Sequence, residues 1–248
     1  MHSPAFFALI IGTEILNRRR EDRHFDFVSK ALLERGHTLS GSFIIEDDPA
    51  LIIQMIQFIR SQPNAVLFSF GGIGSTPDDH TRHCASVALR DGTLHRHTEA
   101  DSIISSNADT ARYPHARHMA MLPQGAKLLR NPVNNMPAFS LDDRYFFMPG
   151  FPEMSHPMVE AILSKHFHEG RPLYRYTLTA LCREGELIPI MEQMPDSVEF
   201  SSLPKLMSEG WQTTISVASH DKEEAEKAFG KYTAALKEKD IYYSLNDA

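Results

Sequence analysis

Cysteine is almost absent from this chain of 248 residues, which contains only Cys84 and Cys182. The two lie far apart in the sequence and no Cys-x-x-Cys pair occurs, so we expect neither a disulfide framework nor a zinc site built from thiolates. So few cysteines fit a reducing compartment, and we expect a cytoplasmic protein.

The chain also lacks an excess of positive charge and a long apolar run. Its 25 Lys and Arg residues against 32 Asp and Glu residues give a formal net charge of −7, which disfavours a protein that coats nucleic acid. The apolar run at residues 5–11 is too short to span a bilayer and has neither the basic flank nor the cleavage site of a signal peptide. We therefore expect no nucleic-acid partner and no membrane association.

What the chain does contain is enough apolar sequence for a sizeable core. Apolar residues make up 42% and charged residues 23% of the chain, as in an average soluble protein. At about 150 residues per domain, this length predicts one or two domains.

The first part alternates apolar strands with amphipathic helices. Residues 5–11, 43–45 and 65–70 read as strands, and helices are expected over residues 25–33, which end before Gly36, and after the Asp48-Pro49 start signal. This order predicts an α/β domain with helices on both faces of a mostly parallel sheet.

The middle of the chain is less regular. Six of the thirteen histidines fall between His80 and His118, and a helix is expected over residues 99–108. Residues 126–129 and 144–148 are predicted to be strands, with a turn at Asp142-Asp143, and a helix follows around Met158.

Turn residues at 169–172 mark an expected boundary between a domain at residues 1–170 and a second one at residues 171–248. The second is predicted to be small and α+β, with strands at 174–182 and 212–218 and helices at 187–194 and 221–239. The edges of its alternating strands need a partner or cover, so we expect a homo-oligomer, most simply a dimer.

The most informative segment is the glycine-rich loop from Gly71 to Asp79, which follows the strand at 65–70 and precedes a helix at 81–90. Its glycines let backbone approach a ligand, and its hydroxyls lie near a helix N-terminus, a combination that favours an anion such as phosphate. A tight turn with Asp78 or Asp79 as the helix cap is the structural alternative. Because two carboxylates repel a bare phosphate, their presence suggests a divalent cation, Mg, Mn or Co, or a positively polarised group between them and the ligand.

Two other loops follow predicted strands of the same sheet. Carboxyl ends of parallel strands meet at one edge, so Gly12-Thr13-Glu14 and Pro149-Gly150 are expected to face the glycine-rich loop across a crevice. Glu14 could equally be a first-turn helix carboxylate. The arginines at 18, 19, 20 and 23 are either a solvated face or a phosphate clamp that folds over this crevice.

Five motifs in order then resemble the CinA family, competence/damage-inducible protein A, whose amino-terminal part is a molybdopterin-binding domain similar to MogA and MoaB. They lie at residues 11–14, 71–81, 122–126, 131–132 and 149–154, and the resemblance covers residues 5–165. The tail from residue 171 looks like the small KH-type domain of longer CinA proteins, although it has no Gly-x-x-Gly loop.

The resemblance implies a three-layer α/β/α domain that binds molybdopterin or a phosphorylated nucleotide. Asp79 matches the aspartate shared with the MogA-type adenylylating enzymes, and Asp78 matches the additional CinA acid; both are candidate catalytic and metal-binding residues. The candidate ligand-binding residues are Gly12, Thr13, Glu14, Gly71, Gly72, Gly74, Ser75, Thr76, Asn131, Pro132, Pro149 and Gly150.

Some members of the family are metal-dependent pyrophosphatases that act on ADP-ribose-like compounds, so one hypothesis is such a hydrolase of ADP-ribose or FAD. The chain departs from the family pattern at residues 18–24 and 131–138, which favours the alternative of a binding protein without turnover. A MogA-like molybdopterin adenylyltransferase is a third hypothesis.

Overall fold

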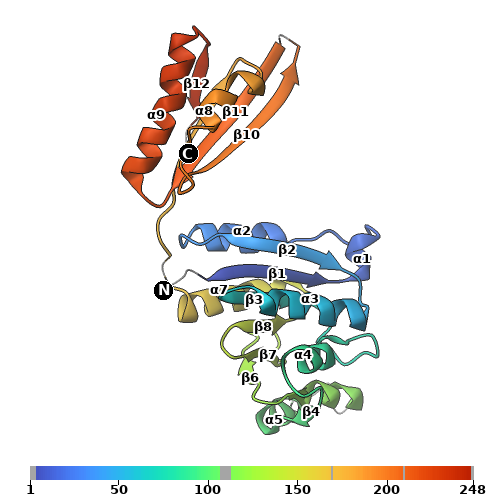
Figure 1. Ribbon diagram of the computed structural model, residues 1–248. Helices are drawn as coiled ribbons and strands as arrows, with labels where there is room; N and C mark the ends of the chain where they lie inside the picture. The colour runs from blue at the N-terminus through green and yellow to red at the C-terminus, as the bar shows by residue number, and fades with distance from the viewer. Residues whose placement is uncertain (1–3, 107–112, 169, 209, 247–248) are drawn as a thin grey trace. The chain divides into compact units, whose positions relative to one another are not determined.

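The computed structural model describes residues 4–106, 113–168, 170–208 and 210–246. The chain divides into two compact units, Met1–Gly170 and Arg171–Ala248 (Figure 1). Among the described residues, no helix has both the length and the apolar character that a bilayer span requires.

The first unit is built on a six-stranded sheet with the order β2-β1-β3-β8-β7-β6. Neighbours among β2, β1, β3 and β8 pair in parallel, whereas β7 is antiparallel to both of its neighbours. The strands are β1 (Ala5–Ile11), β2 (Leu39–Ile45), β3 (Ala65–Phe70), β6 (Lys127–Leu129), β7 (Ala138–Leu141) and β8 (Tyr145–Met148). The expected mostly parallel α/β sheet is therefore confirmed.

Helices cover both faces of this sheet. On one face α2 packs against α7, and on the other α3 packs against α4. The helices are α1 (Thr13–Leu16), α2 (His24–Leu33), α3 (Pro49–Ser61), α4 (Thr81–Leu89), α5 (Thr98–Ser106), the 3₁₀ helix η1 (Pro114–Ala120) and α7 (Pro152–His166), with β4 (Leu94–Arg96) and β5 (Met121–Pro123) in a small antiparallel pair. Residue 108, where α5 was expected to end, lies outside the described residues.

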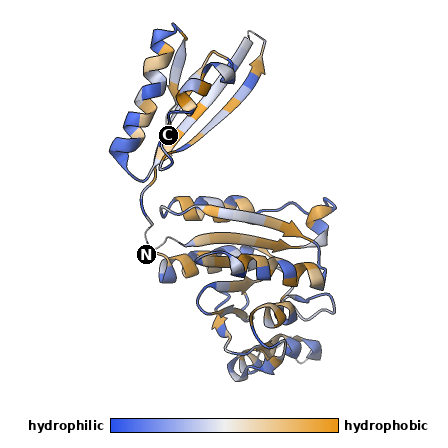
Figure 2. Ribbon diagram, viewed as in Figure 1, coloured by the Kyte–Doolittle hydropathy of each residue, from blue (hydrophilic) through white to orange (hydrophobic). Residues whose placement is uncertain are grey.

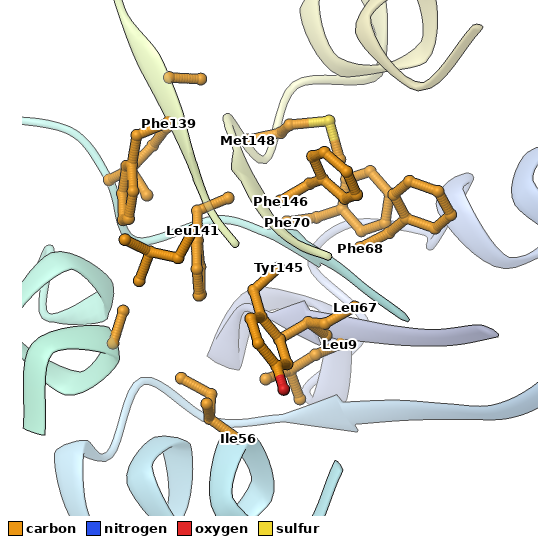
Figure 3. Close-up of a cluster of buried hydrophobic side chains, with 14 of the residues drawn as sticks. Leu9, Ile56, Leu67, Phe68, Phe70, Phe139, Leu141, Tyr145, Phe146 and Met148 are labelled. Carbon is orange, nitrogen blue, oxygen red and sulfur yellow. The ribbon is translucent and has the colours of Figure 1, made fainter. Parts of the chain in front are cut away.

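The two faces of the sheet carry two apolar layers. Phe68 stacks between Phe6 and Phe146 toward α2 and α7, with ring centroids 6.0 and 5.7 Å apart. Leu67 and Tyr145 lie on the opposite face, near Ile56 of α3 (Figure 3). Because both faces are buried, β1 and β3 are apolar at nearly every position, as Figure 2 shows for β1.

Local signals explain several element ends. The Asp48 carboxylate accepts a hydrogen bond of 2.8 Å from the Leu51 N–H and so caps α3, as its sequence predicts. Asp142 and Asp143 have φ of 56° and 51° and form the turn between β7 and β8, which confirms the predicted turn. Strand β7 itself was not predicted, because its four residues are too few to display a period.

The second unit is a four-stranded antiparallel sheet with the order β10-β11-β9-β12. Its elements are β9 (Tyr174–Ala180), η2 (Glu184–Glu186), α8 (Ile188–Met191), β10 (Glu199–Met207), β11 (Gly210–Ser219), α9 (Lys222–Glu238) and β12 (Tyr243–Asn246). Helix α9 packs on β9 and β11 and buries Tyr232 and Leu236. The α+β class is confirmed, but the edge strands β10 and β12 were not predicted. Dimer formation stays a prediction.

His24 joins helix α2 to the sheet in the first unit. The ring is 2% exposed, stacks on Phe70 of β3 with centroids 4.2 Å apart, and has its Nε2 3.3 Å from the Gly150 carbonyl oxygen. Burial, the main cause, lowers the pKa of His24 from 6.5 to about 4.

This shift predicts that acid destabilises the protein before its carboxylates titrate. Below pH 6.5 the unfolded chain protonates His24 while the folded chain does not until about pH 4, so stability falls over this window as the pH falls. Between pH 7 and pH 5 the loss from this residue should be about 2 kcal/mol. Urea unfolding of the parent and of His24→Phe measures it, since the variant keeps a flat ring on Phe70 and removes the titration. Equal pH dependence in the two proteins would contradict the assignment.

Candidate functional site

The candidate site lies at the carboxyl edge of the parallel strands. The loops that follow β1, β3 and β8 meet there, and the Gly71 N–H donates to the Met148 carbonyl at 3.0 Å. A cleft of about 610 Å³ opens between these loops and the segment at residues 131–137. The sequence-based expectation that the three loops share one crevice therefore agrees with the structure.

Most of the predicted site residues line this cleft. They are Glu14, Gly71, Gly72, Gly74, Ser75, Thr76, Asp78, Asp79, Asn131, Pro149 and Gly150. Gly12, Thr13 and Pro132 are not among its lining residues. Thr13 instead donates from its N–H and its hydroxyl to one Asp47 oxygen, at 2.8 Å each, and so ties the β1 loop to the end of β2.

Several lining residues were missed by the sequence reading. They are Ile11, Asp47, Ile73, Met119, Asn134, Met136, Pro137, Phe151 and Met154, whereas Arg20, which also lines the cleft, was anticipated in the clamp interpretation. Asp47 could have been found, because it follows β2, a further parallel strand that ends at the same edge. The apolar residues carry no comparable signal in a single sequence.

The first two glycines of the loop are required by close packing. Gly71 and Gly72 have φ of 103° and 68°, in the region that favours glycine. A Cβ on Gly71 would lie 2.4 Å from the Ile11 carbonyl oxygen, and one on Gly72 would lie 2.2 Å from the Thr81 hydroxyl. That hydroxyl donates to the Gly71 carbonyl at 2.9 Å, so the loop is held against both β1 and the start of α4.

Asp79 binds the loop that precedes it. Its carboxylate accepts hydrogen bonds from the Gly74 N–H at 2.9 Å, from the Thr76 N–H at 2.8 Å and from the Thr76 hydroxyl. The residue that caps α4 is His80, whose side chain makes no capping bond. The alternative of an aspartate capping this helix is therefore wrong, because the Asp79 oxygens are directed to the loop instead.

Arg82, on helix α4, binds the same loop. Its side chain is 7% exposed, and its guanidinium donates to the carbonyl oxygens of Ile73 and Gly74. Burial lowers the pKa of this guanidinium, and the nearby Asp79 opposes that shift. Asp79 thus accepts hydrogen bonds from N–H groups of the loop, and Arg82 donates to its carbonyl groups. These two side chains fix the backbone of the loop without a ligand.

Asp78 differs from Asp79 in being open to solvent. A hydrogen bond with Thr76 is the main cause that lowers its pKa below the usual range, so the group is ionised at neutral pH. Within the ranges that the structure describes, no group of three or more His, Cys, Asp and Glu side chains could hold a metal ion. The described residues alone therefore form no metal cage. A cation at Asp78 would have to be held jointly by this carboxylate, ligand phosphates and water, the mode that Mg²⁺ prefers.

Asn131 forms part of the wall of the cleft. Its side chain is 1% exposed, and its Oδ1 accepts a hydrogen bond of 3.0 Å from the Val133 N–H. Its Nδ2 is buried and has no partner among the described residues. A buried N–H group without a partner is rare in folded proteins and asks for an explanation.

Arg20 is the member of the arginine-rich segment that reaches the cleft. Its guanidinium donates to the Gly150 carbonyl at 2.7 Å, lies 3.7 Å from the Glu14 carboxylate and sits 5.2 Å from the centre of the Phe151 ring. Arg23 instead pairs with Glu153 at 3.3 Å, and both of these side chains are largely exposed. The clamp interpretation thus holds for the position of Arg20 only.

Comparison with known proteins matches most of the first unit to one family model. The model is described as "Probable molybdopterin binding domain" and matches residues 7–169. It ends before the second unit, whose likeness to a KH-type domain stays a prediction.

Individual relatives agree with the CinA resemblance. A "Putative competence-damage inducible protein" of Bacillus pumilus is 25% identical over 237 residues, which are 92% of this chain and 57% of that protein. A CinA-like protein of Desulfotalea psychrophila is 32% identical over 164 residues, 63% of this chain and 39% of that protein. The chain thus spans about two fifths to three fifths of the length of these curated relatives.

A solved structure agrees on the fold. The crystal structure of a CinA protein of unknown function from Thermoplasma acidophilum matches with a TM-score of 0.58 and 22% identity, over 64% of this chain and 97% of that one. Together with the family model, which covers more than half of the chain, these matches confirm the resemblance reached from the five motifs: the chain belongs to the molybdopterin-binding domain family and is similar to CinA proteins.

Proposed function

We propose that the cleft binds a phosphorylated small molecule of the pterin or nucleotide class. The observation that carries the proposal is Asn131, a residue that lines the cleft and whose buried Nδ2 has no partner in the described part of the chain. Leaving such a donor unpaired costs about 1–3 kcal/mol, which an oxygen atom of a ligand would recover. The name of the family supports a pterin as one member of this class.

The glycine-rich loop offers a ligand fewer backbone N–H donors than its glycines first suggest. Because Asp79 accepts the N–H groups of Gly74 and Thr76, these two donors are not free for a phosphate. Donation to phosphate oxygens then falls to Asn131, to Ser75 on the loop and to the Arg20 guanidinium, all of which line the cleft. Arg20 supplies positive charge in a geometry suited to phosphate.

The variant Asn131→Asp tests the proposed donor. It keeps an oxygen that can accept from Val133 and replaces the NH₂ group with a second acceptor. Calorimetry should find the affinity for inorganic pyrophosphate reduced at least tenfold, about 1.4 kcal/mol, because the donor is lost and a charge is added.

Asn134→Asp is the matched control for charge. Asn134 also lines the cleft and accepts a bond from the backbone N–H of Met136, but its side chain is exposed. It should weaken binding less than Asn131→Asp does. Equal losses in the two variants would mean that charge alone is responsible and would remove Asn131 as a donor.

A metal-dependent pyrophosphatase is a second candidate, favoured by the charge of the cleft. Among the described residues that line it are four carboxylates, those of Glu14, Asp47, Asp78 and Asp79, and one guanidinium, that of Arg20. A divalent cation bound with the ligand would neutralise this excess and lower the pKa of a bound water. We assign this cation to Asp78, because both Asp79 oxygens are already hydrogen-bonded.

The dependence on Asp78 can be measured directly. Magnesium should raise the affinity of the parent for pyrophosphate several-fold, and Asp78→Asn should abolish most of that gain, since it removes the charge at nearly constant shape. Hydrolysis of ADP-ribose or FAD with magnesium, manganese or cobalt is assayed in parallel. Turnover no higher in the parent than in Asp78→Asn would contradict the pyrophosphatase and favour a binding protein without turnover. An assay of AMP transfer from ATP to molybdopterin tests the adenylyltransferase alternative.

Asp79 should behave differently from its neighbour. Asp79→Asn replaces one of the two acceptor oxygens that hold Gly74 and Thr76, so the folded state should lose about 1–3 kcal/mol in urea unfolding. The same substitution at Asp78 should change stability much less, because that side chain is exposed. Equal stability of the two variants would contradict the conclusion that the Asp79 carboxylate stabilises the loop through Gly74 and Thr76.

A further inference from the structure

A partly aromatic surface lies beside the glycine-rich loop in the same cleft. Phe151, at the start of α7, is 57% exposed although it lines the cleft, and the Arg20 guanidinium lies over its ring at 5.2 Å. Arg20 is fixed there because it donates to the Gly150 carbonyl. An aromatic ring and a guanidinium are the two side-chain groups on which planar heterocycles stack.

This surface adjoins the proposed phosphate end. A Cβ on Gly150 would lie only 3.3 Å from the Gly71 Cα, so the backbone that carries Phe151 touches the backbone of the loop. Met119, Met136 and Met154 also line the cleft, and thioethers make favourable contacts with aromatic rings. A ligand with a phosphate at the loop thus has an apolar, partly aromatic surface available for a ring.

Glu14 places a negatively charged carboxylate at the edge of this surface. Its carboxylate lines the cleft and lies 3.7 Å from Arg20, beyond hydrogen-bond distance. Among the described groups, none donates a hydrogen bond to this carboxylate, unlike those of Asp47 and Asp79. It therefore has two acceptor oxygens to offer to a ligand, and a carboxylate binds two adjacent N–H donors especially well.

We propose that Glu14, Arg20 and Phe151 hold the ring of the ligand, and that Glu14 selects rings with two adjacent N–H donors on one edge. Guanine and pterins have such an edge, formed by a ring N–H and an amino group, whereas adenine places a ring-nitrogen lone pair there, which a carboxylate repels. The selection therefore favours the binding proposal over hydrolysis of ADP-ribose or FAD, because the adenine ring of those compounds would be disfavoured in this site. The inference rests on the proposed function, because it needs a ligand whose phosphate end lies at the loop. The unpaired Asn131 Nδ2 is an independent sign of a ligand in this cleft.

Calorimetry of the full chain with GMP, AMP and inorganic pyrophosphate tests the inference. The two nucleotides differ only in the ring, and pyrophosphate has none. The parent should bind GMP about tenfold more tightly than AMP. Glu14→Gln should remove this preference by weakening GMP. Phe151→Leu should weaken both nucleotides several-fold and by a larger factor than it weakens pyrophosphate, which has no ring to stack.

Two exposed residues outside the cleft provide matched controls. Glu34→Gln removes a carboxylate at the end of α2, and Phe25→Leu removes a phenyl ring on the same helix. Both should bind all three probes as the parent does. Thermal unfolding of Glu14→Gln and Phe151→Leu establishes that each is folded before it is titrated.

The outcomes separate the two proposals. If pyrophosphate and both nucleotides fail to bind the parent, the proposed function is overturned and the ring site with it. If the probes bind but GMP and AMP do so equally, or if Glu14→Gln keeps the preference, the selection by Glu14 is overturned while the phosphate site stands. Unchanged nucleotide binding by Phe151→Leu would remove the stacking surface.

Discussion

The parallel pairing of β3 with β1 on one side and β8 on the other is the constraint on which the rest of the site depends. Parallel neighbours end at the same edge, so the residues after Ile11, Phe70 and Met148 come together although 59 positions separate the first two and 78 the last two in the chain. The register leaves so little room that only glycine fits at position 71, directly beside the Ile11 carbonyl. The cleft thus follows from sheet topology, and its shape follows from backbone packing.

The architecture was largely readable from the sequence, because buried parallel strands and amphipathic helices have strong periodic signals. The strand at 65–70 and the loop after it needed only an apolar run and a cluster of glycines. The four-residue β7 and the edge strand β10 gave no such signal: β7 is too short, and β10 is exposed along most of its length. Short or exposed strands are defined by their neighbours, which a single sequence does not reveal.

The sequence predicted the location of the site better than it predicted the roles of the individual residues. Asp78 and Asp79 read as a pair, yet one is a solvent-facing carboxylate and the other fastens the loop through Gly74 and Thr76. Adjacent residues point in different directions in a turn, so two identical side chains next to each other in the sequence can have different hydrogen-bond partners and exposure. The position of Arg20 depends on the Gly150 carbonyl, 130 residues away, which no local pattern encodes.

The internal hydrogen bonds of the loop have a consequence for the thermodynamics of recognition. Asp79 and Arg82 already fix its backbone, so a ligand meets a surface that is ordered before it arrives. The conformational entropy that a flexible loop would lose on association has here been lost during folding. Recognition by such a rigid surface is close to lock and key, and differences in affinity among ligands should then appear mainly in how fast each one leaves.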